Sequence, residues 1–194
     1  MLYFIVYIYK YRFSISFGGF MEYIGILWNT VNFLKEEIMG DISKFGEIVD
    51  YFELNLGEDY EEFVKKIYEF DGIADWKIKL KLDSMKAVDC AKIIVLFIKI
   101  DDSKIEFNDR KQKNVITNIE NLKKYIREKY SKRIDNYYFD NVFHMTDNKE
   151  ELLAMLKVLR EWCSSHMSPL EAENSNDLCK KLVLERKCGN SENK

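Results

Sequence analysis

Residues Lys92–Ile100 form the stretch that most restricts how this chain can fold. They read Lys-Ile-Ile-Val-Leu-Phe-Ile-Lys-Ile, so the apolar residues are almost continuous and mostly β-branched or aromatic. This composition favours a strand, and the continuous apolar character is typical of a strand that is buried on both faces. We therefore expect a sheet in which Lys92–Ile100 is an internal strand.

Strand and helix patterns alternate around that stretch. Further strands are expected at residues 23–28, 47–56 and 137–144. Apolar residues at helical spacing predict helices at residues 34–45, 59–70, 114–130 and 149–162. The segment Gly72–Met85 fits both a half-exposed strand and a helix, and both interpretations stay open.

The order of these elements is close to β-α-β-β-α-β with a terminal helix. This is the ferredoxin-like split βαβ arrangement of an α/β (α+β) protein. We therefore expect a four-stranded, mainly antiparallel sheet with helices packed on it.

The chain of 194 residues suits one domain, which is expected at residues 21–165. Residues 1–20 form a hydrophobic N-terminal extension, which reads as an extra strand, a weak membrane-surface anchor or an upstream translation extension. It is too short to span a bilayer, which needs about 20 apolar residues, so no transmembrane segment is expected. Residues 166–194 are rich in Ser, Asn, Glu and Cys, and we expect a mostly flexible C-terminal tail.

The charge balance, the aromatic content and the cysteines indicate which partners and which cellular compartment to expect. Thirty Lys and Arg stand against 33 Asp and Glu, which gives a net charge of −3 and no support for a nucleic-acid partner. The aromatic content of 14% and the single proline argue against a largely disordered chain. The four cysteines form no C-x-x-C pair and read as reduced thiols, so we expect a cytoplasmic protein.

His144, one of two histidines, stands where a strand pattern gives way to a helix pattern. A helix N-terminus offers partial positive charge and free N–H groups to an anion. Because the ordinary pKa of histidine is near neutrality, His144 is a candidate nucleophile or proton carrier. The alternative is that His144 is a semi-buried structural residue that forms one hydrogen bond with a backbone carbonyl. The chain holds neither a G-x-G-x-x-G motif nor a P-loop, so the common dinucleotide and P-loop functions lack support.

The segment Asn141-Val142-Phe143-His144-Met145-Thr146-Asp147-Asn148 resembles the active-site segment of the nucleoside diphosphate kinase family. In that family the pattern is Asn, two apolar residues, His, Gly, Ser, Asp and Ser. Tyr125-Ile126-Arg127 resembles the family's Ile-Arg-Gly segment, whose Arg contacts phosphate. Arg110 has the spacing of the other phosphate-binding Arg, and Tyr68 lies in a second helix, as the family's active-site Tyr does. The resemblance covers about residues 21–163.

The resemblance implies a ping-pong phosphotransferase that forms a phosphohistidine on His144. Arg110 and Arg127 would neutralise the phosphates of a bound nucleotide such as ATP, and Asn141 would position a ribose or phosphate oxygen. Thr146 would form a hydrogen bond near the imidazole. Mg²⁺ would enter with the nucleoside triphosphate, with no metal ligand from the protein. The resemblance also allows a homo-oligomer.

Two departures from the family pattern keep a second function open. The family's first strand ends in Lys-Pro-Asp, and that Lys contacts the transferred phosphate, whereas the corresponding place here reads Trp28-Asn29-Thr30. Met145 replaces the Gly that follows the catalytic His. The alternative is therefore a catalytically inactive module on the same fold, used for protein–protein interaction.

Overall fold

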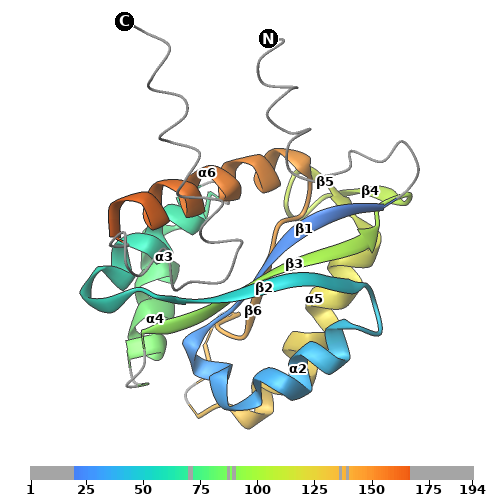
Figure 1. The fold of residues 1–194 in the computed structure, drawn as a ribbon. Coiled ribbons are helices and arrows are strands. Elements are labelled where there is room, and N and C mark those ends of the chain that lie inside the picture. The colour runs from blue at the N-terminus through green and yellow to red at the C-terminus, as the bar shows by residue number, and fades with distance from the viewer. Residues whose placement is uncertain are drawn as a thin grey trace, which may run out of the picture.

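The four-stranded sheet is the centre of the molecule (Figure 1). A computed structural model describes residues 20–69, 72–86, 88, 91–135, 137–138 and 140–166. The strands are β1 (Phe20–Leu27), β2 (Glu47–Asn55), β3 (Lys92–Asp101) and β6 (Phe143–Met145). Their order is β2-β3-β1-β6, and every neighbouring pair is antiparallel.

This order confirms the ferredoxin-like split βαβ fold. The chain passes from β1 through α2 (Lys35–Ile42) to β2, and β3 fills the space between those two strands. It then passes from β3 through α5 (Thr117–Tyr130) to β6, and β1 fills that space. The prediction that Lys92–Ile100 is an internal strand is also confirmed, because β3 pairs with β1 and β2 and is buried from Ile93 to Ile98.

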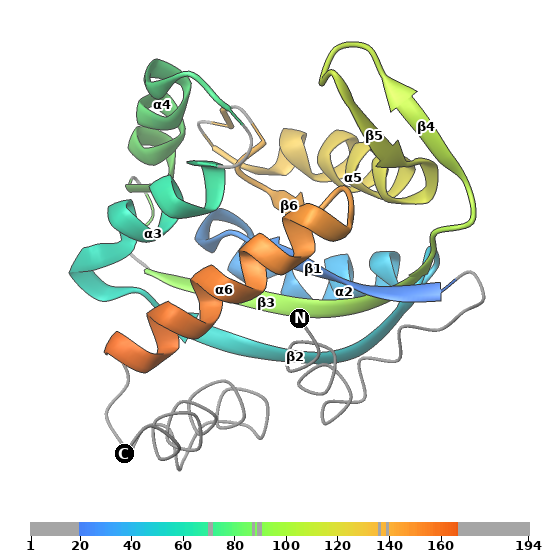
Figure 2. The same ribbon diagram turned by 90° about the horizontal axis from the view of Figure 1, so that it is seen from above.

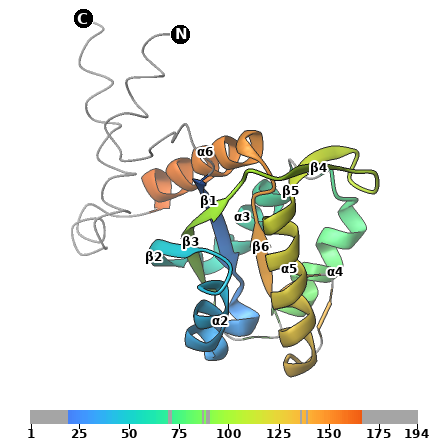
Figure 3. The same ribbon diagram turned by 90° about the vertical axis from the view of Figure 1, so that its right-hand side faces the viewer.

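Helices cover both faces of the sheet. Helices α2 and α5 lie side by side on one face, while α6 (Lys149–His166) crosses the other (Figure 3). The buried carboxylate of Asp41 on α2 accepts hydrogen bonds from Tyr130 Oη at 2.7 Å and Lys129 Nζ at 2.5 Å. Burial alone would raise the pKa of Asp41, but the hydrogen bonds from Lys129, Lys44 and Tyr130 hold it well below its ordinary value. This charged contact joins the two crossover helices.

The remaining elements connect these strands and helices along the chain. They are η1 (Asn29–Leu34), η2 (Gly57–Asp59), α3 (Tyr60–Tyr68), α4 (Asp75–Lys86), β4 (Ile105–Asn108), β5 (Lys113–Ile116) and η4 (Ser131–Arg133).

The structure resolves the ambiguous segment Gly72–Met85, because α4 is a helix. Its buried residues Ile78, Lys81, Leu82 and Met85 follow helical spacing, so the alternation of Lys with apolar residues is not a strand pattern here.

The strand expected at 137–144 is much shorter than predicted. β6 holds only Phe143–Met145, and Tyr137 and Tyr138 lie outside it. Asp140 has a left-handed backbone with φ 57°, which breaks the extended conformation that the aromatic run favours.

Two local features complete the fold around β6. The polar residues 109–112 form the turn of the β4–β5 hairpin, whose strands are too short for a sequence pattern to reveal. Side chains cap the start of α6: Glu151 N–H donates to Asn148 Oδ1 at 2.9 Å, and Asp147 N–H donates to Glu151 Oε2 at 2.7 Å.

The predicted N-terminal extension and C-terminal tail lie outside the described residues, apart from Phe20 in β1 and His166 at the end of α6. Across the part of the chain that the structure describes, every helix falls short of the length and apolar character needed to cross a bilayer.

Gly46 and Gly40 provide a matched test of the packing between α2 and β3. A Cβ on Gly46 would lie 2.6 Å from the backbone oxygen of Lys99, whereas a Cβ on Gly40 would meet nothing within 4 Å. Gly46→Ala should therefore lower the free energy of unfolding by about 1–3 kcal/mol. Gly40→Ala, within a helix, should raise it by about 0.5–1 kcal/mol. Urea denaturation measures both, and changes of the same sign would contradict the described approach of Gly46 to β3.

Candidate functional site

His144 lies in the middle of β6, the short edge strand that pairs with β1, and its register partner is Ile26. The side chain is only 6% exposed. Tyr68, the last residue of α3, meets the imidazole edge-on, with ring centroids 5.1 Å apart. Tyr68 also stacks on Trp28 with centroids 6.0 Å apart. The structure thus brings together two predicted site residues, His144 and Tyr68.

The imidazole of His144 is kept neutral by its surroundings. Burial lowers its pKa well below the ordinary value, and the positive charges of Lys81, Lys123, Arg127 and Lys113 lower the pKa further. A neutral imidazole keeps a lone pair available at neutral pH, which nucleophilic attack on phosphorus requires.

Arg127 reaches the same strand from α5. Its Nε donates to the carbonyl oxygen of Phe143 at 3.0 Å, and one terminal nitrogen forms an ion pair with Asp140 at 3.0 Å. The guanidinium is therefore anchored to the residue before His144, on the strand that the sequence predicted. Its planar fork suits bidentate phosphate binding, but in this conformation Asp140 and a carbonyl take up part of it.

Asn141 is fully buried in the turn before β6. Its Nδ2 donates to Ser84 Oγ at 3.0 Å, and its backbone oxygen accepts from the hydroxyl of Thr30. Within the described ranges its Oδ1 has no hydrogen-bond partner. A buried acceptor without a partner is unfavourable, which leaves Asn141 able to accept one more donor.

Thr146 contacts β1 at the point where the pairing of β1 with β6 ends. Its Oγ1 accepts from the backbone N–H of Ile24 at 3.2 Å, and its own N–H donates to the Ile24 carbonyl at 3.0 Å. Pairing of β1 with β6 ends at Met145, so the backbone of Ile24 needs partners that Thr146 supplies. The hydroxyl of Thr146 thus binds β1.

Arg110 lies apart from this group. It is exposed in the turn of the β4–β5 hairpin, at the end of the molecule where the hairpin stands out (Figure 2). Among the described contacts, none joins Arg110 to His144, Tyr68 or Arg127. Its spacing from Arg127 suggested a shared site, but the hairpin between them places Arg110 at an exposed tip.

The ion pairs of Asp147, a buried carboxylate near the start of α6, were not predicted from the sequence. Asp147 contacts the ammonium groups of Lys111 at 2.8 Å and Lys113 at 3.1 Å, and it also contacts Lys123. These lysines come from the hairpin and from α5, so they could be grouped only once the topology was known. They anchor both elements to the turn that follows β6, and Lys113 and Lys123 also add positive potential around His144.

Lys81 on α4 is the other site residue that the sequence did not reveal. It is 2% exposed, and its ammonium lies over the rings of Tyr68 at 4.5 Å and Trp28 at 5.1 Å from their centroids. Its Nζ donates to the carbonyl oxygen of Asp140 at 2.8 Å. A strand reading of this segment exposes Lys81, whereas a helix places it on the face of Ile78 and Met85.

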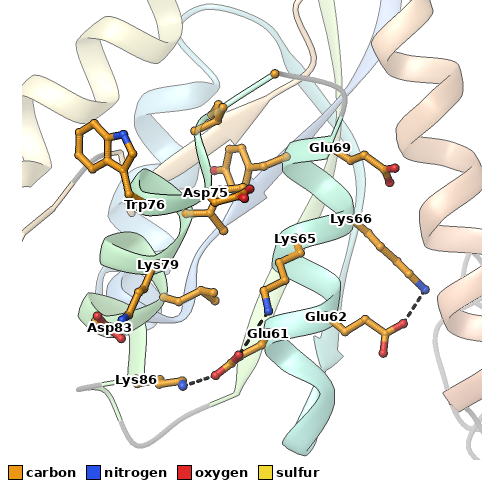
Figure 4. Close-up of a pocket in the computed structure, with 15 residues that line it drawn as sticks. Glu61, Glu62, Lys65, Lys66, Glu69, Asp75, Trp76, Lys79, Asp83 and Lys86 are labelled. Carbon is orange, nitrogen blue, oxygen red and sulfur yellow. Dashed lines mark ion pairs between the residues drawn. The ribbon is translucent and has the colours of Figure 1, made fainter.

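A groove of about 900 Å³ runs between α3 and α4 and reaches Tyr68 (Figure 4). Its walls carry side chains of both charges. Glu61 on α3 forms an ion pair with Lys86 on α4, and Glu62 forms an ion pair with Lys66 within α3. Tyr68 thus lines the groove and also contacts the imidazole of His144.

The residues do not form a protein-built metal centre. Among the described residues, no group of three or more His, Cys, Asp or Glu side chains converges as metal ligands do. Asp140 and Asp147 are paired with cations.

Comparisons with known proteins add a distant likeness of fold. No protein-family model and no curated protein matches the chain. The nucleoside diphosphate kinase of Aquifex aeolicus aligns with 78% of this chain and 98% of its own, at 11% identity and a TM-score of 0.46. A nucleoside diphosphate kinase from Borrelia burgdorferi, solved as a transition-state mimic with bound vanadate and ADP, aligns over 78% and 89%, at 16% identity and a TM-score of 0.42. At these values the likeness carries no information about chemistry.

The lowered pKa of His144 predicts how stability depends on pH. Below pH about 6.5 the unfolded chain binds a proton at this residue that the folded chain excludes, while above it neither state does. The free energy of unfolding should therefore fall by up to about 1.4 kcal/mol per pH unit between pH about 6.5 and 5.

Urea denaturation across that pH range tests this dependence. His144→Gln should remove the decline, whereas His166→Gln, at the only other histidine, should leave it unchanged. A decline that persists in His144→Gln would show that other groups cause it.

Proposed function

We propose that this chain is a nucleotide-dependent phosphotransferase of the nucleoside diphosphate kinase type, with the phosphate carried on His144. The observation that carries the proposal is the neutral imidazole, which contacts Tyr68 and lies one residue from the anchor point of Arg127. Its support in the sequence is the likeness of Asn141–Asn148 to the family's active-site segment.

The reaction would proceed in two displacements. A lone pair of His144 attacks the γ-phosphorus of a nucleoside triphosphate, the bond to the bridging oxygen breaks, and its electrons leave on the diphosphate. A terminal oxygen of a second nucleoside diphosphate then attacks the phosphohistidine, the P–N bond breaks, and the ring recovers its lone pair.

Other residues would bind and orient the nucleotide. Arg127 would exchange the Asp140 carboxylate for a phosphate, and the free Oδ1 of Asn141 would accept from a ribose hydroxyl. Tyr68 would hold the imidazole in position. Arg110 would contribute to phosphate binding only if the hairpin turn bends toward the site. A nucleotide partner, a magnesium ion carried by ATP, a homo-oligomer and a cytoplasmic location all belong to this proposal.

A specific observation favours the second candidate, a non-catalytic module on the same fold. His144 is 6% exposed, Arg127 is ion-paired, and Trp28 stands where the family has its phosphate-binding Lys. In that case the fold would serve protein–protein contact, and the buried histidine would only pack.

Labelling with γ-³²P ATP and Mg²⁺ distinguishes the two candidates. We expect an acid-labile, base-stable label on the wild-type chain and none on His144→Gln, because only the imidazole forms the P–N bond. Arg127→Met should weaken ATP binding by about tenfold or more, since it removes a charge-assisted contact with phosphate. A wild-type chain that binds ATP but never becomes labelled would favour the non-catalytic module.

Two further variants serve as comparisons. Lys124→Met removes a cation from the exposed side of α5 and should leave ATP affinity unchanged. Arg110→Met tests the exposed arginine separately, and a loss equal to that of Arg127→Met would show that the hairpin closes over the nucleotide.

A further inference from the structure

The groove between α3 and α4 combines apolar and charged side chains. Ile73, Ile78 and Leu82 are among the apolar residues that line it, and Trp76, near the start of α4, is 58% exposed. Charged side chains from both helices surround these residues (Figure 4). Such a groove suits an amphipathic helix, whose apolar face lies against the apolar lining while its polar residues meet the charges.

The charges of the groove are only partly paired. Among the described residues, three of its exposed carboxylates have no ion-pair partner: Glu69, Asp75 and Asp83. Lys79 also has no ion-pair partner within that part of the chain. Three carboxylates against one ammonium leave a net charge of −2. An occupant with an excess of positive charge would therefore complement the groove.

The chain itself holds a segment of this kind. Residues 177–188 read Asp-Leu-Cys-Lys-Lys-Leu-Val-Leu-Glu-Arg-Lys-Cys, with four Lys and Arg against two Asp and Glu, which gives a net charge of +2. Asn176 before the segment and Gly189 after it are typical of helix ends. A helix would place four apolar residues on one face, because they form two pairs spaced by four: Leu178 with Leu182 and Cys179 with Val183.

The end of α6 brings this segment within reach of the groove. Trp162 on α6 packs edge-on against Phe63 of α3 with ring centroids 5.1 Å apart, and the ammonium of Lys66 lies 5.8 Å from the centroid of Trp162. Lys66 also lines the groove. Ten residues, 167–176, separate the end of α6 at His166 from the segment. When extended they span about 33 Å, which exceeds the width of a helix, about 10–12 Å.

We infer that residues 177–188 dock in the groove between α3 and α4 as an amphipathic helix of the same chain. Their apolar face would lie against the apolar lining, and Lys180 and Lys181 would pair with the carboxylates that have no other ion-pair partner. The inference does not rest on the proposed phosphotransfer. Because Tyr68 lines the groove and contacts His144, the docked segment would lie beside the candidate site.

Carbodiimide cross-linking of the full chain tests this contact, because it joins an ammonium to a carboxylate only where the two meet. In the wild type we expect amide cross-links from Lys180 or Lys181 to the groove carboxylates, mapped by mass spectrometry. Leu182→Asp should lower their yield by about fivefold or more, since it puts a charge on the apolar face. Leu184→Asp changes a residue outside that face and should keep the wild-type yield.

The outcomes separate the same chain from other occupants. A wild type without cross-links between residues 177–188 and the groove would overturn the inference. Equal yields in Leu182→Asp and the wild type would do the same, and so would cross-links of equal yield to Glu128, an exposed carboxylate on α5.

A mixture of isotope-labelled and unlabelled chains identifies which copy supplies the segment. Cross-links within one copy support the inference, whereas cross-links only between copies would show that the groove takes the segment of a second chain and would overturn it. No nucleotide enters these measurements, so their failure leaves the phosphotransfer proposal untouched.

Discussion

The pairing of β1 with β6 is the interaction on which the candidate site depends. β6 is only three residues long, yet backbone hydrogen bonds extend the contact on both sides, from Trp28 N–H to Val142 at 3.2 Å and from Thr146 N–H to Ile24 at 3.0 Å. Gly25 permits this approach, because a Cβ there would lie 2.8 Å from the ring of Phe143. The ladder thereby fixes the backbone of His144 against the strand end where Trp28 and Lys81 lie.

Positively charged side chains surround the neutral imidazole of His144. Lys81, Lys113, Lys123 and Arg127 all lower the pKa of His144, although each of them has its own acceptor among the carboxylates and carbonyls of the loops. Such a field favours an incoming anion and keeps the imidazole unprotonated at the same time. The two effects work together in a site for phosphate transfer, because the nucleophile has to be neutral while the substrate is strongly negative.

The sequence predicted the features that depend on local pattern. The apolar run of β3, the helical spacing of α5 and the order of elements were enough to give the ferredoxin-like topology. Contacts that depend on tertiary placement could not be predicted in this way. Lys81 looked exposed until α4 proved to be a helix, and Arg110 looked suitable by spacing until the hairpin placed it at an exposed tip. Arg127 and Tyr68 were singled out through the family resemblance, and the helices α5 and α3 place both of them in contact with β6.

Asp140 joins α4 and α5 to the loop before β6, because it contacts both Lys81 and Arg127. Its left-handed backbone, with φ 57°, ends the aromatic run and directs its carbonyl to Lys81 and its carboxylate to Arg127. The carboxylate is 40% exposed and the guanidinium 22%, so solvent screens the ion pair, and such pairs contribute about 0–1 kcal/mol. The guanidinium beside His144 is therefore held by a weak, solvent-screened ion pair with Asp140 and by a hydrogen bond to the carbonyl oxygen of Phe143.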